Sequence, residues 1–379
     1  MPAFAEARVD LDVISANVAA LRERAPNSHF MGVVKADGYG HGMIPAARAM
    51  LAGGATWLGV AFIEEALEVR RAGIDTPLLA WIVPPGAPIG AAIEAGVELG
   101  ISDPWVLDAT VAAARAAGRP ARVHLKADTG LNRGGITREG WPEVVEAAAR
   151  AEAAGVLQVT GVFSHLARAD EPADPGARDS VQAQLDAFDE ALALADKAGL
   201  RPEVRHIANS AALLTRPDSH FDLVRPGIAA YGLSPMPDLR DIGVRPAMTL
   251  AARVALVKRV PAGSGVSYGH RYVTDRETTL ALVPLGYADG VPRAASNIGP
   301  AALGGRRHVI AGTVCMDQFV LDVGNDPVEA GDEVVLFGDG ENGVPTAQDW
   351  AEALGTIPYE IVTRVGVRVP RTYRSGAVS

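Results

Sequence analysis

The stretch from Phe30 to Gly42, FMGVVKADGYGHG, joins an apolar run to a glycine-rich turn through a lysine, Lys35. The run has the composition of a buried strand, and the glycines after it mark the end of that strand. Burial disfavours the ammonium form of a lysine, so a lysine at this junction requires an explanation. The chain has only four lysines among its 35 Lys and Arg residues, which leaves few candidates for lysine chemistry.

Seven similar apolar runs follow, and together they predict eight strands: His29–Lys35, Trp57–Ala61, Pro77–Val83, Val97–Ser102, Ala121–Lys126, Val159–His165, Glu203–Ala208 and Asp222–Gly227. Alanine-rich helical segments ending at a glycine lie between them, including Ile63–Gly73, Trp105–Gly118, Trp141–Gly155 and Val181–Gly199. This alternation predicts parallel strands with crossover helices. Near-continuously apolar strands in eight units favour a closed (β/α)8 barrel over a Rossmann-type sheet, and no GxGxxG motif follows an early strand.

The composition of the sequence changes after Leu233–Pro246, where Pro and Gly residues begin to separate Val- and Thr-rich runs. These runs predict a mostly β domain, with a short helical insert at Ala347–Gly355 and Pro358–Val365. We therefore predict an α/β chain with an N-terminal TIM-type barrel over residues 12–238 that binds a cofactor. A β-rich C-terminal domain would cover residues 239–379, and residues 1–11 would join this second domain.

Composition excludes several classes of protein. The net charge is −10 with a pI near 5.3, and no cluster of Lys and Arg occurs, so we expect no nucleic-acid partner and no anionic-membrane surface. A single cysteine, Cys315, excludes an internal disulfide framework. The chain has no secretory leader pattern and no apolar run long enough to cross a membrane. We expect a cytoplasmic protein.

Polar side chains gather where the predicted strands end, which is where barrels of this type carry their reactive groups. They are Lys35 with Tyr39 and His41, Lys126 with Asp128, Asn132 and Arg133, His165, His206 with Asn209 and Ser210, and Arg225. A single strand-end histidine is more often structural than functional. Their convergence on one barrel mouth favours a site, and no metal-ligand pattern stands out.

A lysine at a barrel mouth suggests covalent chemistry with a carbonyl, because burial lowers the ammonium pKa and frees the amine. The carbonyl belongs either to a substrate, as in an aldolase acting on a sugar phosphate, or to a cofactor such as pyridoxal phosphate. The cofactor needs a phosphate cradle and a partner for its ring nitrogen. Ser210, a tyrosine hydroxyl and the amides of Gly227 and Ile228 offer the cradle, and Arg225 offers the partner.

Six ordered motifs resemble those of bacterial alanine racemases: VVKADGYGHG (33–42), KADTGLNRGG (126–135), HIANSAA (206–212), VRPGIAAYG (224–232), GSGVSYG (263–269) and GTVCMDQ (312–318). They span nearly the whole chain, and the first is highly specific. The resemblance implies a fold-type III pyridoxal-phosphate enzyme with a small amino-acid substrate. It also implies a head-to-tail homodimer whose active sites are shared between subunits.

The resemblance assigns roles position by position. Lys35 would hold the cofactor, and its phosphate or ring would be bound by Tyr39, His206, Asn209, Ser210, Arg225, Gly227, Ile228 and Tyr359. Tyr268 from the partner subunit would be the second acid/base group, with His165 supporting it and His206 supporting Arg225. Arg133, Tyr287 and the backbone of Met316, the last from the partner subunit, would contact or enclose the substrate. In many family members the lysine matching Lys126 is carbamylated, which places an anion beside Arg133.

Racemisation of alanine by two bases follows from these roles, because the α-proton must leave from one face and return to the other. By resemblance, Lys35 handles the proton of the D-enantiomer and Tyr268 that of the L-enantiomer. Arginine does not give up its proton, so Arg225 would leave the cofactor ring largely unprotonated. The product D-alanine would supply cell-wall peptidoglycan.

Two alternatives remain open at this point. One is a racemase of broader specificity for serine or basic amino acids, although Tyr287 and Tyr359 match positions that narrow the family's entrance. The other is a non-enzymatic pyridoxal-phosphate-binding protein, a class that lacks the β domain. The chain departs from the family pattern at Leu131 and Asn132, where Met and Gly are common, so the backbone near Arg133 could differ.

Overall fold

The computed structural model describes residues 4–236 and 238–376, so the ends of the chain and position 237, which fall inside the predicted domain ranges, lie outside the described residues. The chain forms two compact units. One unit comprises residues 18–38 and 47–230, and we call it the barrel unit. The other comprises residues 1–17, 39–46 and 231–379, and we call it the β-rich unit.

Eight parallel strands form the barrel unit: β2 (His29–Val33), β3 (Trp57–Phe62), β4 (Leu78–Ile82), β5 (Glu98–Ile101), β6 (Ala121–Lys126), β7 (Leu157–Phe163), β8 (Val204–His206) and β9 (Leu223–Val224). They pair in the order β8-β7-β6-β5-β4-β3-β2-β9. Strand β9 therefore returns beside β2 and nearly closes the sheet, which confirms the predicted barrel. Strand β2 stops at Val33, two residues before the predicted end, because the chain turns sharply at Lys35.

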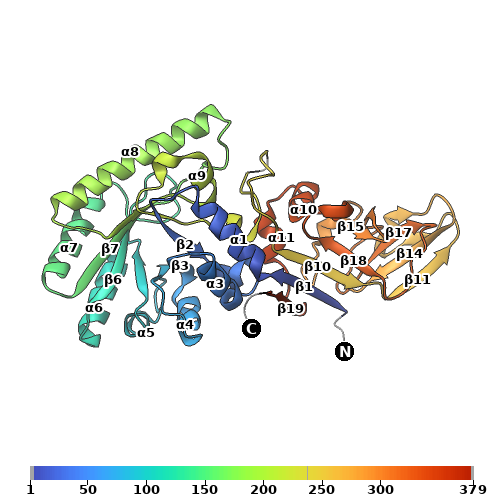
Figure 1. The fold of residues 1–379 in the computed structure, drawn as a ribbon, viewed down its shortest axis with the longest axis horizontal. Helices are drawn as coiled ribbons and strands as arrows, with labels where there is room; N and C mark the ends of the chain where they lie inside the picture. The colour runs from blue at the N-terminus through green and yellow to red at the C-terminus, as the bar shows by residue number, and fades with distance from the viewer. Residues whose placement is uncertain (1–3, 237, 377–379) are drawn as a thin grey trace. The chain divides into compact units, whose positions relative to one another are not determined.

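Helices follow the strands and cover the outside of the barrel (Figure 1): α4 (Ile63–Arg71), α5 (Ile89–Glu94), α6 (Pro104–Ala117), α7 (Trp141–Ala153), α8 (Pro175–Lys197) and the short α9 (Ser210–Thr215). Local signals set their ends. Asp103 caps α6 by accepting a hydrogen bond from Trp105 N, and Gly118 ends it with φ 65°. The chain passes between the units within α1 (Leu11–Arg22) and α3 (Met43–Ala52).

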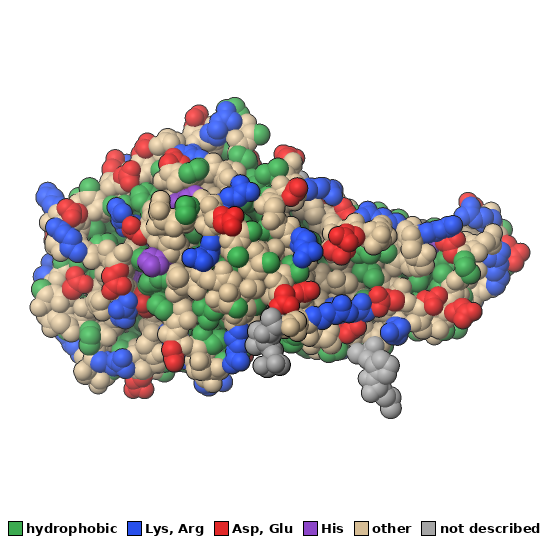
Figure 2. Space-filling model, in the orientation of Figure 1, with side chains coloured by type: hydrophobic (Ala, Val, Ile, Leu, Met, Phe, Trp, Pro, Cys, Tyr) green, Lys and Arg blue, Asp and Glu red, His purple; other side chains and the backbone are tan. Residues whose placement is uncertain are grey.

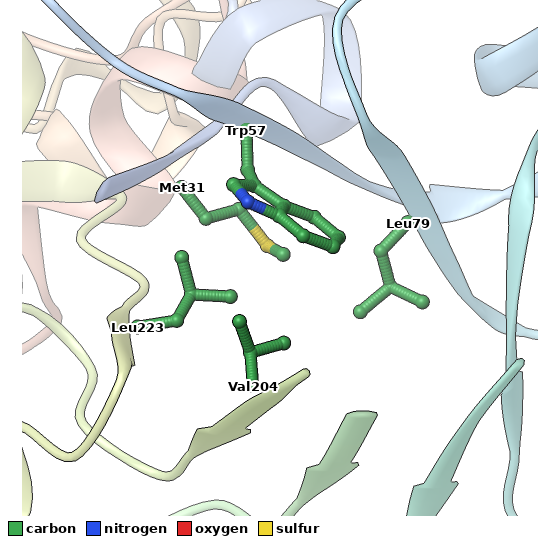
Figure 3. Close-up of a cluster of buried hydrophobic side chains, with 5 residues drawn as sticks. All are labelled: Met31, Trp57, Leu79, Val204 and Leu223. Atoms are coloured by element: carbon green, nitrogen blue, oxygen red, sulfur yellow. The ribbon is translucent and has the colours of Figure 1, made fainter. Parts of the chain in front are cut away.

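A cluster of buried apolar side chains lies inside the barrel. Met31, Trp57, Leu79, Val204 and Leu223 come from five different strands and point toward one another (Figure 3). Each is at most 5% exposed. Burial of side chains of this size stabilises the fold by about 1.5–3 kcal/mol each. This packed layer fixes the positions of the strand ends that carry the polar residues.

The β-rich unit contains a six-stranded sheet in the order β16-β15-β18-β10-β1-β19. Its strands are β16 (Arg306–Val309), β15 (Pro300–Leu303), β18 (Glu333–Phe337), β10 (Met248–Arg253), β1 (Ala5–Asp10) and β19 (Arg371–Arg374). Strand β1 pairs antiparallel with β10 and parallel with β19, so the N-terminal strand is part of this unit. The prediction of a mostly β second domain is confirmed.

Smaller elements complete the β-rich unit. One three-stranded sheet contains β11 (Leu256–Val260), β14 (Thr278–Val283) and β17 (Phe319–Gly324), and a two-stranded ribbon contains β12 (Gly265–Val266) and β13 (Tyr272–Val273). The predicted helical insert is present as α10 (Ala347–Leu354) and α11 (Pro358–Thr363). Thr346 and Asp349 form a capping box at the start of α10, and Gly355 ends the helix with φ 66°.

Charges of both signs are interspersed over the face drawn in Figure 2. None of the helices in residues 4–236 and 238–376 combines the length and apolar character that a membrane span needs. Within the same residues, no group of three or more His, Cys, Asp or Glu side chains is placed to hold a metal ion.

Candidate active site

The polar residues at the strand ends lie on one end of the barrel unit. Lys126 is the last residue of β6 and His206 the last of β8, while Lys35, His165 and Arg225 each follow the end of their strand within two residues. Carboxyl ends of parallel strands share one face of a barrel, so these side chains surround a common mouth. Arg133 lies in the loop after β6 and is exposed.

The turn that carries Lys35 is left-handed. Ala36, Asp37 and Gly38 have φ values of 54°, 52° and 60°, and Tyr39 follows with 53°. A left-handed conformation costs a residue with a side chain roughly 1–2 kcal/mol, so three such residues within four positions, Ala36, Asp37 and Tyr39, need support from their surroundings. Sequence patterns gave no sign of this conformation beyond the glycines of KADGYG. Strain of this kind is concentrated at functional sites in proteins, which makes the turn a candidate for function.

Glu65 supplies that support from helix α4. One carboxylate oxygen accepts a hydrogen bond from Ala36 N at 2.7 Å. The other accepts from Ala61 N at 2.8 Å and Phe62 N at 3.0 Å. The carboxylate therefore ties the turn after β2 to the end of β3.

Lys35 is only partly accessible at this mouth. Burial, together with the positive charge of Arg133, lowers its pKa, and the charge of Arg225 adds to this against the opposing charge of Glu65. Its Nζ atom lies 5.7 Å from the centre of the Trp81 ring. The lower pKa gives Lys35 a larger fraction of nucleophilic amine at neutral pH than a lysine in water has.

Arg225 is buried, and the protein surrounds its guanidinium with acceptors. Nη2 donates to Ser164 O at 2.7 Å and to Ile207 O at 3.3 Å, and lies 3.3 Å from His165 Nδ1. Nη1 lies 2.9 Å from His206 Nδ1. These acceptors are carbonyl oxygens and ring nitrogens, without a carboxylate among them. Burial lowers the pKa of Arg225 to about 9, which still leaves it a cation at neutral pH.

Burial and the same neighbouring positive charges lower the pKa values of His165 and Lys126. Burial, with the charge of Arg225 next in size, holds the pKa of His165 well below its ordinary value, so its ring is neutral. Burial and the charge of Arg133 lower the pKa of Lys126 to about 8. The Lys126 Nζ atom lies 5.9 Å from the centre of the Phe163 ring. Two lysines and two arginines thus lie at one mouth, and repulsion between these cations adds to burial in lowering the pKa values of both lysines.

A second group of donors lies beyond β8 and β9. Ser210 is buried, and its Oγ accepts hydrogen bonds from Gly227 N at 2.9 Å and Ala229 N at 3.4 Å. The hydroxyl proton can then be donated to a further acceptor. Asn209 caps α9 by accepting from Ala212 N at 3.0 Å. Two backbone amides thus hold the Ser210 oxygen, and its hydroxyl is available to donate to an anion without a cationic side chain.

Three tyrosines of the β-rich unit lie together. The ring of Tyr39 is 5.0 Å from that of Tyr231 and 6.1 Å from that of Tyr359, centre to centre. His41 lies 4.5 Å from the Tyr231 ring. Burial raises the pKa of Tyr39, so its hydroxyl stays protonated and can donate.

Tyr268 and Met316 lie on the surface of the β-rich unit, 73% and 53% exposed, and Tyr287 is 44% exposed. Their backbone is nevertheless held firmly. Thr313 Oγ1 donates to Tyr268 O at 2.8 Å. Tyr287 N donates to Cys315 O at 3.1 Å, and the next residue, Ala288, donates from its N to Met316 O at 3.0 Å. Backbone positions held by these hydrogen bonds therefore carry three exposed side chains, which are accessible to another molecule.

Gly286 permits this close arrangement. A Cβ atom at this position would lie 2.3 Å from Met316 O and 2.4 Å from Cys315 O, so only glycine fits. Asp289 then accepts a hydrogen bond from Gly286 N at 2.9 Å and receives two more from Arg368. The sequence motif LGYADG is therefore explained by backbone packing.

Sequence reasoning missed three residues that the structure connects to the site: Glu65, Glu98 and His124. Glu98 and His124 stand inside apolar strands, and the structure shows them hydrogen-bonded to each other and to the side chains behind Arg225. A charged or titratable residue within an otherwise apolar strand was the available signal. Glu65 gave a weaker signal, because an acidic residue in the first turn of a helix is common.

Known proteins match this chain over nearly its full length. Residues 9–235 match the family description "Alanine racemase, N-terminal domain", and residues 247–373 match "Alanine racemase, C-terminal domain". An alanine racemase of Thermobifida fusca is 67% identical over 378 residues, which cover 100% of both chains. One from Mycobacterium avium is 51% identical over 98% of this chain and 95% of its own length.

Solved structures give the same result. The crystal structure of alanine racemase from a D-cycloserine-producing Streptomyces lavendulae aligns with a TM-score of 0.97 at 57% identity, covering 99% of this chain and 98% of that one. Alanine racemase from Bacillus anthracis, with bound L-Ala-P, aligns with a TM-score of 0.89 at 34% identity, covering 100% of this chain and 97% of that one.

Proposed function

The chain belongs to the alanine racemase family, and from that premise we propose that it interconverts L-alanine and D-alanine with pyridoxal phosphate as cofactor. The observation that carries the proposal is the pairing, at one barrel mouth, of Lys35 on a strained turn with a buried Arg225 whose acceptors include no carboxylate. The first is a nucleophilic amine and the second a cationic partner that does not release its proton.

The donor set supports the proposed cofactor. The hydroxyl of Ser210 and the amide of Ile228 would donate to a phosphate, and the amide of Gly227, which donates to Ser210 Oγ in the structure, would join them. The protonated hydroxyl of Tyr39 and that of Tyr359 would add to this set. Asn209 would hold the start of α9 in place. When bound, pyridoxal phosphate supplies a carbonyl for an amine and a conjugated ring that stabilises the electron pair left when the α-proton departs.

Lys35 would bind the cofactor covalently and then act at one face of the substrate. Its Nζ, with its lowered pKa, would take or return the α-proton of D-alanine. Tyr268 Oη would do the same at the opposite face for L-alanine. Because Tyr268 is exposed on the β-rich unit, we propose that it acts in the site of a second copy of the chain, in a homodimer with shared active sites.

Arg225 would face the nitrogen of the cofactor ring. A guanidinium donates a hydrogen bond there but keeps its proton at neutral pH. By leaving the ring unprotonated, Arg225 would weaken its withdrawal of electrons and so limit return of the proton to the wrong carbon, the step that leads to transamination. His206 would hold the guanidinium, and His165, neutral at the same mouth, would support Tyr268 of the partner subunit.

Lys126 would be carbamylated by carbon dioxide. The reaction requires a neutral amine, and a pKa of about 8 provides a substantial neutral fraction near physiological pH. The product is an anion that would pair with Arg133, whereas the unmodified ammonium repels it. Arg133 would then be held toward the substrate carboxylate and the cofactor hydroxyl.

Tyr287 and Tyr359 would narrow the substrate entrance, and the backbone of Met316 from the second copy of the chain would contact the substrate. We therefore favour alanine over serine or basic amino acids. The product D-alanine would serve peptidoglycan synthesis in the cytoplasm. Failure of the gene to relieve D-alanine auxotrophy in a racemase-free bacterium would count against this role.

Proton NMR of L-alanine in D2O with the cofactor-loaded protein, followed by chiral analysis, tests the activity. We expect the α-proton signal to disappear as D-alanine accumulates. Persistence of that signal with L-alanine, combined with its loss from serine, lysine or arginine, would favour a broader racemase. Persistence with every amino acid would contradict the proposed function.

A further inference from the structure

A row of buried side chains leads from Arg225 into the barrel. His206 lies next to Arg225, with 2.9 Å between Arg225 Nη1 and His206 Nδ1. The other ring nitrogen of His206, Nε2, lies 2.8 Å from His124 Nδ1. His124 Nε2 in turn lies 2.6 Å from Glu98 Oε2. Each of these four residues is at most 7% exposed, and we call them the buried relay.

The protons of the buried relay have one consistent arrangement. A guanidinium only donates hydrogen bonds, so His206 Nδ1 accepts from Arg225. A neutral imidazole has one N–H, which therefore lies on His206 Nε2 and is donated to His124 Nδ1. His124 carries its own proton on Nε2 and donates it to Glu98. The arginine at one end and the carboxylate at the other thus fix both histidine tautomers.

The charge of Glu98 and the neutrality of His206 agree with this arrangement, and the neutrality of His124 follows from the donor and acceptor geometry alone. Burial alone would raise the pKa of Glu98, but the hydrogen bond from His124 and the charge of Arg122 bring it below the ordinary value, so Glu98 is ionised. Burial, with the charge of Arg225 next, keeps the pKa of His206 well below its ordinary value, so its ring is neutral. A further proton on either ring would bring two donors face to face.

Two further side chains donate to Glu98. Arg122 Nε donates to Glu98 Oε1 at 3.0 Å, and Thr160 Oγ1 donates to Oε2 at 2.9 Å. Arg122 also pairs with Glu203 at 3.4 Å, on the exposed side. A buried carboxylate with three hydrogen-bonding partners, here His124, Arg122 and Thr160, has a defined position and a defined charge.

The strands are shaped to admit the two imidazole rings. A Cβ atom at position 161 would lie 2.1 Å from His124 Nδ1, so Gly161 leaves the space that the ring occupies. The register between β6 and β7 shifts between Val123 and His124. Phe163 stacks on His206 with 5.0 Å between ring centres and 7° between planes. The neighbours of the relay therefore hold the rings at fixed angles.

We propose that Glu98, acting through His124 and His206, is the residue that positions Arg225 for the reaction, which makes Glu98 and His124 positioning residues of the site. This inference rests on the proposed function and extends it inward from Arg225 to Glu98. A carboxylate at the far end polarises each hydrogen bond in the row, so it strengthens His206 Nδ1 as an acceptor. Arg225 is then held in one orientation with its positive charge compensated at a distance.

The proton arrangement is testable in the full chain by nitrogen NMR of 15N-histidine-labelled protein, with and without pyridoxal phosphate. We expect both His206 and His124 to be neutral with the proton on Nε2. In Glu98→Gln, which removes the charge but keeps the shape, the signals of both rings should move. A charged ring, or a proton on Nδ1 of either ring, in the unsubstituted protein would overturn the proposal without any variant.

Kinetics of the loaded enzyme test the consequence. Glu98→Gln should lower kcat for L-alanine by about tenfold or more with little change in KM, because outer partners of a site residue typically contribute 10–100-fold and Glu98 does not reach the mouth. Glu203→Gln is the matched control, since Glu203 shares Arg122 but does not contact His124. It should leave kcat and both ring signals unchanged.

The outcomes separate this inference from the proposed function. Altered ring signals together with a lower kcat in Glu98→Gln alone support it. An unchanged kcat, or an effect confined to KM, would overturn it even if racemisation itself is intact. If the chain racemises no amino acid, the proposed function fails while the NMR measurement still reports whether the relay has the stated proton arrangement.

Discussion

Around Arg225 the barrel unit surrounds its polar groups with protein, whereas Tyr268 of the β-rich unit is 73% exposed. Both regions have a fixed backbone. The turn after β2 holds Ala36 and Asp37 in left-handed conformations, and Ser267, next to Tyr268, has φ 59°. They differ in what their side chains contact. The hydrogen-bond acceptors of Arg225 lie within its own unit, while the side chain of Tyr268 is exposed on the surface of its unit.

The difference teaches that the proposed active site has a complete half and an incomplete half. The half with Lys35 and Arg225 has its electrostatics set within one chain, because burial and neighbouring cations determine the pKa values there. The side chain of Tyr268 is exposed in the single chain, and in the proposed dimer the second copy would cover it. Substitutions in the half with Lys35 and Arg225 should therefore affect the reaction and the stability of one chain. Substitutions in the half with Tyr268 should affect activity only in the proposed dimer.

The largest expected effect is on the complete half. Lys35→Ala removes both the covalent attachment and one proton-transfer group, so we expect kcat/KM to fall at least about 1,000-fold. The measurement is the rate of D-alanine formation. Lys197→Ala, at the exposed end of α8, is the matched control and should keep full activity. Retained racemisation in Lys35→Ala would separate Lys35 from the chemistry.

Arg225→Glu should come next in size. A carboxylate in place of the guanidinium requires a donor from His206 Nδ1, which reverses the proton arrangement against Glu98 at the other end of the relay. We expect D-alanine formation to fall about 100-fold or more, with a larger share of turnovers giving pyruvate. Measuring both products from one reaction checks this. An unchanged ratio of pyruvate to D-alanine would contradict the role given to the guanidinium.

The fold was predictable because its signals are local. Each barrel strand is an apolar run bounded by turn residues, and Gly118 and Gly355 end helices where the sequence indicates. Part of the site followed from the same logic, since Lys35, His206 and Arg225 stand at the ends of predicted strands. Position in a barrel then brings them to one mouth.

The buried relay could not be predicted in this way. Glu98 and His124 belong to different strands, and their contact depends on a register shift in β6 and on the space left by Gly161. Neither feature has a signature in a single sequence. The left-handed turn after β2 also escaped prediction, because Ala36 and Asp37 rarely adopt that conformation without support from outside the segment, here Glu65.

A smaller effect should appear at that turn. Glu65→Gln replaces a carboxylate that accepts three backbone hydrogen bonds with an amide that has one oxygen and an NH2 group facing donors. We expect the free energy of unfolding to fall by about 1–3 kcal/mol, with weaker retention of the cofactor. Denaturant unfolding measures the first and dialysis the second.

Glu64→Gln on the same turn of α4 provides the comparison, since Glu64 is exposed. It should leave stability within about 0.5 kcal/mol of the unsubstituted chain. Equal effects of the two variants would mean that the carboxylate of Glu65 does not support the strained turn.

The smallest effect concerns the reactivity of Lys126 in the cofactor-loaded protein. Its pKa of about 8 lies below the ordinary lysine value, so the neutral amine dominates above pH 8 and the ammonium below it. In bicarbonate-free buffer, an amine-acetylating reagent near pH 8 should modify Lys126 faster than Lys258, as measured by peptide mass spectrometry. Added bicarbonate should slow the modification of Lys126. Equal rates for the two lysines would contradict the lowered pKa.

Mixing two inactive variants tests the central claim most directly, namely that the half with Lys35 and the half with Tyr268 come from different chains. Lys35→Ala and Tyr268→Phe protein are unfolded together, refolded and loaded with cofactor. Random pairing gives half mixed dimers, each with one intact site, so about one quarter of the unsubstituted activity should return. If both groups act within one chain, no intact site forms, and the mixture would stay as inactive as its components.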